Sequence, residues 1–227
     1  FFISCIVDYF IIRRCYQWES VRITGFIRWK WGYLPKAIID ATLELYEQKT
    51  SLKGVQGKEA EYLSAKELLN SIYGMMVTDI LRPEIPYNLE NNQWGVLENG
   101  ILKMKIPVSG DQKQTLLDKY NGDMQRFTYY PWGVFITAYA RHMLWSAILE
   151  FKDDYIYSDT DSIKCLNLDA HRDFIDRYNA HMREKISACL AYYGFDSSRS
   201  APKTIKGVEK PLGVWELEDP LDRKSVV

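Results

Sequence analysis

Two neighbouring segments with helical spacing of their apolar residues constrain the fold of this chain more than any other feature. Apolar side chains recur at helical spacing over residues 35–52 and again over residues 58–77, the period of an amphipathic helix. Pro35 suits the first turn of a helix, and Gly54 and Gly57 bracket a turn between the segments. The sequence therefore predicts a hairpin of two antiparallel helices.

The rest of the chain is predicted to mix strands and helices, which gives an α+β fold. Residues 1–31 are rich in β-branched and aromatic side chains, a composition typical of strands. The other expected elements, in chain order, are a β-hairpin and loop over 81–130, a helix over 132–149, two short strands around a polar turn over 154–166, an amphipathic helix over 171–193 that ends at Gly194, and a loop or edge strand over 202–220.

Charge and cysteine usage exclude several classes of protein. The formal net charge is −1, so the overall balance does not indicate a polyanion partner, and any nucleic-acid surface must be local.

The four cysteines form no close pair, a spacing that fits neither a zinc cluster nor a disulfide framework. We expect reduced thiols and a cytoplasmic location. The apolar start is interrupted by Asp8 and is too short to span a bilayer, so we expect no membrane partner.

The run from Tyr157 to Ser162 contains two carboxylates, Asp159 and Asp161, at the predicted bend between strands. Residues two positions apart lie on one face of a strand, and a tight turn also gathers them, so both acids can share a hard cation. Two Mg²⁺ ions, with Mn²⁺ as a substitute, suit phosphoryl transfer. A solvated turn explains this motif equally well, and so does the metal site of a nucleotide-sugar glycosyltransferase.

The second predicted helix carries a polar face beside its apolar stripe. Lys66, Asn70 and Tyr73 are spaced i, i+4 and i+7, which places an ammonium, an amide and a phenol on one side. A lysine binds phosphate as a point charge, and an aromatic ring packs against a sugar or base. Each of these residues alone fits an ordinary exposed helix face.

In order and spacing, this helix followed by the carboxylate turn resembles the second and third signature motifs of family B DNA polymerases. The run from Leu45 to Gly54 and the motif from Thr137 to Arg141 are similar to those of the protein-primed branch, which occurs in phages, linear plasmids and some viruses. The resemblance implies a phage source and an enzyme of the host cytoplasm. It also implies a palm with an antiparallel sheet backed by helices, two-helix fingers, and a β-hairpin insertion that embraces DNA.

The resemblance assigns roles to individual residues. Asp159 and Asp161 match the metal-binding, catalytic aspartates of the third motif. The matches to the nucleotide site are Lys66, Asn70 and Tyr73, with Lys49 and Lys53 as weaker candidates for phosphate contacts. Thr137 and Arg141 match a primer-template contact, although an i, i+4 pair is also an ordinary structural feature of a helix. The implied partners are a DNA primer-template, deoxynucleoside triphosphates and a terminal protein that primes synthesis.

The implied reaction is template-directed nucleotidyl transfer from a deoxynucleoside triphosphate to a primer 3′-hydroxyl. The expected organisation is palm strands in 1–34, fingers in 35–80, an insertion in 81–130, palm with the metal-binding turn in 131–221, and a tail in 222–227. The tail resembles a translated sequencing adapter, which would make it non-native, and the alternative is a genuine polar tail.

Two parts of the family pattern do not occur in this sequence. They are the Asp-x-x-Ser-x-Tyr-Pro motif, which carries the remaining palm carboxylate, and the Lys-x-Tyr motif. We therefore expect a truncated piece that is inactive alone. The alternatives are a metal-dependent nucleotide-sugar glycosyltransferase and a non-catalytic DNA-binding remnant.

Overall fold

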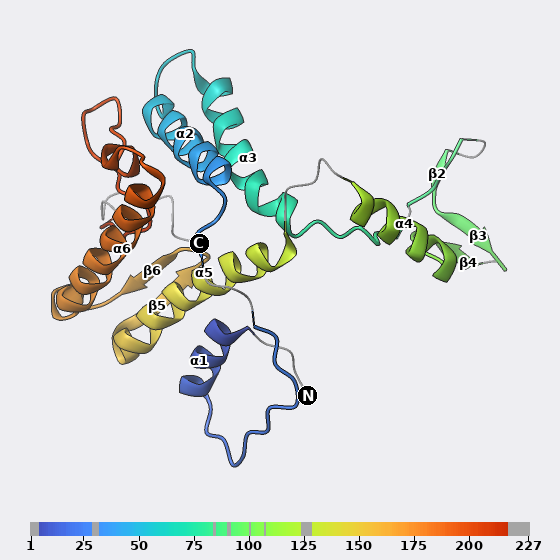
Figure 1. The fold of residues 1–227 in the computed structure, drawn as a ribbon, viewed down its shortest axis with the longest axis horizontal. Coiled ribbons are helices and arrows are strands. Elements are labelled where there is room, and N and C mark those ends of the chain that lie inside the picture. Colours follow the sequence, from blue (N-terminus) through green and yellow to red (C-terminus); the bar gives the residue numbers. More distant parts are fainter. Residues whose placement is uncertain are drawn as a thin grey trace. The chain divides into compact units, whose positions relative to one another are not determined.

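The computed structural model describes residues 5–28, 32–83, 85–89, 92–99, 101–106, 108–123 and 129–217. Within them the protein is mostly helical, with three small two-stranded antiparallel sheets (Figure 1). The fold is thus α+β in its coarse class. The predicted tail, 222–227, lies outside the described residues.

The secondary-structure elements follow one another along the chain as follows. The α-helices are α1 (Ile6–Cys15), α2 (Lys36–Leu52), α3 (Glu59–Met76), α4 (Gly110–Gly122), α5 (Tyr130–Phe151) and α6 (Arg172–Tyr193). The strands are β1 (Tyr87–Asn88), β2 (Gln93–Trp94), β3 (Val96–Glu98), β4 (Ile101–Lys103), β5 (Tyr155–Asp159) and β6 (Ser162–Cys165). Three short 3₁₀ helices are η1 (Lys152–Asp154), η2 (Leu168–His171) and η3 (Ser197–Ser200).

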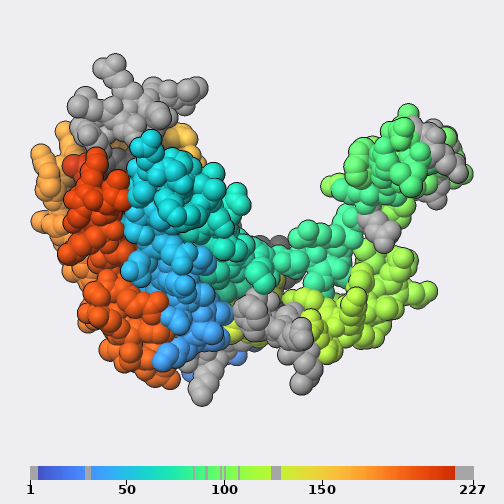
Figure 2. All heavy atoms as spheres, turned by 90° about the horizontal axis from the view of Figure 1, so that it is seen from above, coloured from blue at the N-terminus to red at the C-terminus, as the bar shows by residue number. Residues whose placement is uncertain are grey.

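The chain divides into two compact units, Phe1–Gly74 with Pro131–Val227, and Met75–Tyr130. The predicted helical hairpin belongs to the first unit and is confirmed, because α2 and α3 lie side by side (Figures 1 and 2). Gly54 and Gly57 have φ angles of 80° and 77° in the connection, a left-handed conformation that glycine adopts without a steric penalty.

The predicted helix over 132–149 and the predicted pair of strands over 154–166 are also confirmed. Helix α5 leads through η1 into β5 and β6, which pair in antiparallel register with Asp159 opposite Ser162. Helix α6 ends at Gly194, whose φ of 71° and backbone N–H bond to Leu190 O form a left-handed C-cap.

Small and aliphatic side chains from several helices form the core of the first unit. Buried positions include Ile38 and Leu43 of α2, Ala138 and Ala147 of α5, and Leu190 of α6. The chain after α6 is tied back to α2, because Tyr46 Oη donates to Lys210 O at 3.1 Å and Arg199 forms an ion pair with Asp40 at 2.7 Å. These contacts hold the segment after α6 against α2.

The prediction of palm strands in 1–34 was wrong. The described residues of that segment, 5–28 and 32–34, contain no strand, and Ile6–Cys15 form helix α1. Val7 and Ile11 are its buried residues, and their i, i+4 spacing puts them on one helix face. Asp8 lies in the first turn and Arg13 and Arg14 lie in the last turn, so each charge is opposite in sign to the nearby end of the helix dipole. Burial on one helix face overrides the β-propensity of these residues.

The prediction for 81–130 was correct about hairpins but missed a helix. Strands β1 and β2 form one hairpin and β3 and β4 another. Helix α4 follows, and its start is a capping box in which Ser109 Oγ accepts from Gln112 N, and Gln112 Oε1 accepts from Ser109 N. A Ser-x-x-Gln pattern of this kind indicates a helix N-terminus.

Among the described residues, no helix has both the length and the hydropathy to cross a bilayer.

Candidate functional site

The two predicted metal ligands lie at the tip of the β5–β6 hairpin. Asp159 pairs with Ser162, so only Thr160 and Asp161 form the connection between the strands. Asp159, Thr160 and Asp161 are all exposed. A connection this short brings both carboxylates to one end of the hairpin, as the sequence predicted.

Thr160 has a φ of 48°, a left-handed conformation that is a genuine outlier for a β-branched residue. Local hydrogen bonds hold the turn in this form. Thr160 Oγ1 donates to Asp159 Oδ1 at 3.0 Å, and Ser162 Oγ donates to Asp159 O at 3.1 Å. Backbone strain of this kind persists where surrounding contacts enforce it, and it occurs frequently at functional sites.

The opposite end of the hairpin is closed by Asp154, Asn167 and His171, which we call the Asp154 clasp. Asn167 Nδ2 donates to Asp154 Oδ1 at 2.8 Å, and His171 Nε2 lies 2.9 Å from Asp154 Oδ2. The hydrogen bond with His171, and then the one from Asn167, lowers the pKa of Asp154 below its usual range. The His171 ring packs against buried Phe151 in a tilted arrangement, with ring centroids 4.5 Å apart and an angle of 39° between the ring planes. The clasp therefore anchors both strands to the helical body.

Lys66, Asn70 and Tyr73 are all exposed on α3, as their spacing predicted. Gly74, which follows Tyr73, has open space where a Cβ would stand. The residues of this polar face and the two aspartates thus lie on different elements, α3 and the β5–β6 turn.

The two weaker phosphate candidates lie at the end of α2. Lys49 is half-buried, and its Nζ lies 5.8 Å from the centroid of the Tyr46 ring, within the range of a cation–π contact. Lys53 is exposed at the C-cap of the helix. Lys53 is therefore the more accessible cation of the two.

The predicted DNA contacts on α5 have intramolecular partners. Thr137 Oγ1 donates to the carbonyls of Gly133 and Val134 at 3.1 and 3.0 Å, so this hydroxyl serves the helix itself. Arg141 donates from Nε and Nη2 to the two carboxylate oxygens of Asp8 on α1, at 2.9 and 2.7 Å. These hydrogen bonds are the main reason that the pKa of Arg141 is raised and that of Asp8 is lowered.

Asp8 is a residue of this region that the sequence reasoning did not assign. Its only signal was its position as a lone acid in an apolar run. Its hydrogen bonds with Arg141 tie α1 to α5.

The described residues contain no group of three or more His, Cys, Asp or Glu side chains placed to hold a metal. None of the four cysteines, all of which lie among the described residues, forms a disulfide. Comparisons with models of protein families, with curated proteins and with solved structures found no match to this chain.

Proposed function

We propose that this chain contributes the fingers and part of the palm of a protein-primed family B DNA polymerase. In this assignment α2 and α3 are the fingers, residues 81–130 are the insertion, and α5, β5, β6 and α6 belong to the palm. The proposal rests on the motif resemblance together with one structural observation. Asp159 and Asp161 flank a strained residue at the exposed tip of a two-stranded hairpin.

The donor set at this tip suits Mg²⁺. Magnesium prefers a small number of carboxylates and completes its octahedron with water and substrate phosphate oxygens. Asp159 and Asp161 are exposed, so both can meet a bound triphosphate. The ions would stabilise the charge that develops on the attacking and leaving oxygens.

The remaining residues would act on the nucleotide by binding and orientation. Lys66 is an exposed cation on α3, suited to neutralising phosphate oxygens of a deoxynucleoside triphosphate. Asn70 and Tyr73 lie on the same helix face and would contact the sugar and base. In the reaction, the primer 3′-oxygen bonds to the α-phosphorus, and the bond to pyrophosphate breaks. A nucleotide held in line contributes mainly by proximity and orientation.

A binding experiment on the whole chain tests this proposal against a nucleotide-sugar glycosyltransferase. We expect a deoxynucleoside triphosphate with Mg²⁺ to bind more tightly than a uridine diphosphate sugar, measured by calorimetric titration. Lys66→Ala should weaken triphosphate binding about 10-fold, in line with the loss of one charge-assisted contact. Lys206→Ala is the control, since Lys206 is an exposed cation in the segment after α6.

Preferential binding of the nucleotide sugar, lost on Asp161→Ala, would favour the glycosyltransferase. Binding of DNA with no metal-dependent nucleotide binding would favour a non-catalytic DNA-binding remnant. Either result would overturn the proposed function.

A further inference from the structure

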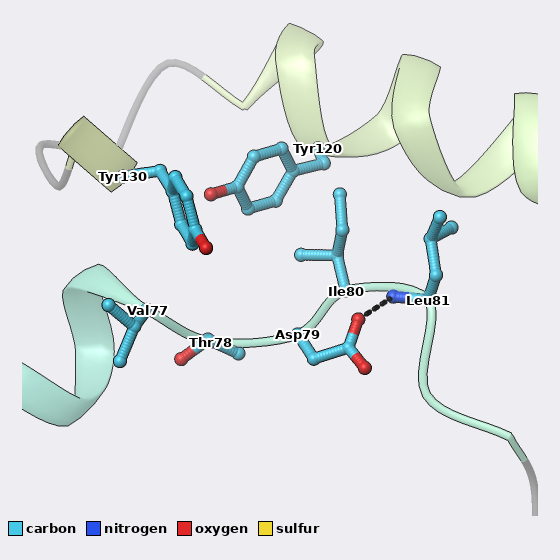
Figure 3. A pocket seen from close by; sticks show the side chains of 7 residues that line it. All are labelled: Val77, Thr78, Asp79, Ile80, Leu81, Tyr120 and Tyr130. Atoms are coloured by element: carbon cyan, nitrogen blue, oxygen red, sulfur yellow. Dashed lines mark hydrogen bonds between the residues drawn. The ribbon is translucent and has the colours of Figure 1, made fainter. Parts of the chain in front are cut away.

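A pocket of about 330 Å³ lies within the second unit. Residues 77–81, which follow α3, form one wall, and Tyr120 of α4 and Tyr130 at the start of α5 form the other (Figure 3). This volume falls within the range of roughly 300–1,000 Å³ that small-molecule sites occupy. None of the residues assigned to the proposed function lines this pocket.

The wall opposite the tyrosines is apolar and has a defined shape. Val77, Ile80 and Leu81 supply aliphatic surface. Asp79 Oδ1 accepts from the Leu81 backbone N–H at 2.9 Å, an Asx turn that sets the path of the segment. Figure 3 shows this bond within the turn and both tyrosine rings facing the segment from the helix side. The pocket therefore presents two phenol rings to a ligand over an apolar floor.

We infer that this pocket binds a base of a single-stranded nucleic acid by stacking on Tyr120 and Tyr130. A flat ring with π-faces fits between aromatic side chains and aliphatic surface. Such stacking tolerates any base, because every base has a π-face. Tyr130 is 57% exposed, so its ring is accessible to an incoming strand.

Exposed cations beside the pocket favour a nucleic-acid strand as the ligand. Arg82 and Lys119 directly adjoin the lining residues Leu81 and Tyr120 in the chain, and both are exposed. Two cations suit the phosphates on either side of a stacked base. Asp79, the acid among the lining residues, accepts the hydrogen bond from the Leu81 backbone N–H.

The experiment measures the affinity of the whole chain for a fluorescein-labelled single-stranded oligonucleotide by anisotropy. Tyr120→Ala and Tyr130→Ala should each weaken binding roughly 5- to 100-fold, the range that stacking on an aromatic side chain supplies. Tyr120→Phe and Tyr130→Phe keep the ring and should bind within about twofold of the original chain. Tyr129→Ala is the matched control, because Tyr129 precedes Tyr130, is exposed and does not line the pocket.

A second readout does not depend on folding of the variants. An oligonucleotide that contains 5-iodouracil should photo-crosslink to Tyr120 or Tyr130 of the unaltered chain, identified by mass spectrometry. Crosslinks only at other residues, or alanine variants that bind as the original does, would overturn the inference. Equal competition by a free mononucleotide would also overturn it, by showing that the pocket takes a nucleotide rather than a strand.

The outcome is separable from that of the proposed function. Tyr130→Ala alters none of the residues assigned to the nucleotide, so it should weaken oligonucleotide binding and leave Mg²⁺-dependent triphosphate binding unchanged. Loss of oligonucleotide binding in Tyr130→Ala would therefore support the pocket whether or not a triphosphate binds near Asp159.

Discussion

Arg141 of α5 donates two hydrogen bonds, of 2.9 and 2.7 Å, to the carboxylate of Asp8 of α1. The pair joins residues 133 positions apart in the chain. A guanidinium fork fits a carboxylate in the same bidentate manner in which it fits a phosphate. Asp8 therefore occupies the guanidinium group of Arg141, the residue to which the family resemblance assigns a DNA contact. A DNA phosphate would have to compete with Asp8 for this group.

Asp8→Asn should destabilise the first unit modestly. The Arg141 side chain is 51% exposed and that of Asp8 is 21% exposed, so solvent screens the pair and we expect a loss of about 1 kcal/mol. Urea unfolding measures the change. Asp169→Asn is the control, since its ion pair with Arg172 is far more exposed and lies within one helical turn. Equal losses in both variants would contradict a structural role for the Asp8 pair.

The Asp8 pair should also make stability depend on pH at the acidic end. The Arg141 hydrogen bond holds the pKa of Asp8 below its ordinary value of 3.8. A lowered folded-state pKa means that the stabilisation is fully present above pH 3.8 and is lost as the pH falls through the folded-state pKa. Urea midpoints of the original chain and Asp8→Asn should therefore converge below about pH 3.8. A gap that stays constant down to pH 2.5 would refute the linkage.

Thr160→Asn should yield a more stable chain than Thr160→Val. Thr160 has a φ of 48°, a region that asparagine tolerates and that costs a β-branched residue roughly 1–2 kcal/mol. Asparagine also keeps a polar group beside Asp159, whereas valine removes the hydroxyl that donates to it. We expect a difference of about 1 kcal/mol in urea unfolding. A valine variant as stable as the asparagine variant would show that the turn carries no such strain.

Asp161→Ala should remove nucleotide incorporation but not DNA binding when this chain is assayed within a complete enzyme. A metal ligand acts on the chemical step, so we expect a loss of roughly 100-fold or more in primer extension. Gel-shift affinity for a primer-template should stay within about twofold. Asp153→Ala, at an exposed acid of η1, is the control and should keep its activity.

The purified 227-residue chain should show no templated synthesis by itself. The Asp-x-x-Ser-x-Tyr-Pro motif, which carries the remaining palm carboxylate in the family that this chain resembles, does not occur in this sequence, and a two-metal mechanism needs fixed ligands for both ions. Primer extension with Mg²⁺ and four deoxynucleotides measures this directly. An Asp159→Ala, Asp161→Ala double variant controls for a contaminating polymerase. Extension that disappears only in the double variant would mean that another carboxylate completes the site.

Local signals explain which elements could be predicted from the sequence. The α2–α3 hairpin, the β5–β6 turn and the end of α6 at Gly194 depend on periodicity and glycine placement within a short stretch. Helix α4 also had a local signal, because Ser109 and Gln112 have the spacing of a capping box. The glycines and prolines on either side of it favour a loop, which outweighed that signal in the prediction.

Long-range contacts explain what could not be predicted. Helix α1 has the composition of a strand, and its burial at Val7 and Ile11 and its pairing with Arg141 depend on packing that no local pattern encodes. The spacing of Asp159 and Asp161 predicted their meeting at one turn. It said nothing about their placement relative to Lys66, which depends on how separate elements pack.

The Asp154 clasp makes the stretch from Phe151 to His171 a self-contained cassette. Its two ends meet through Asp154, Asn167 and His171, and Phe151 covers the junction. The two carboxylates thus stand at the free end of a hairpin whose base is closed by its own side chains.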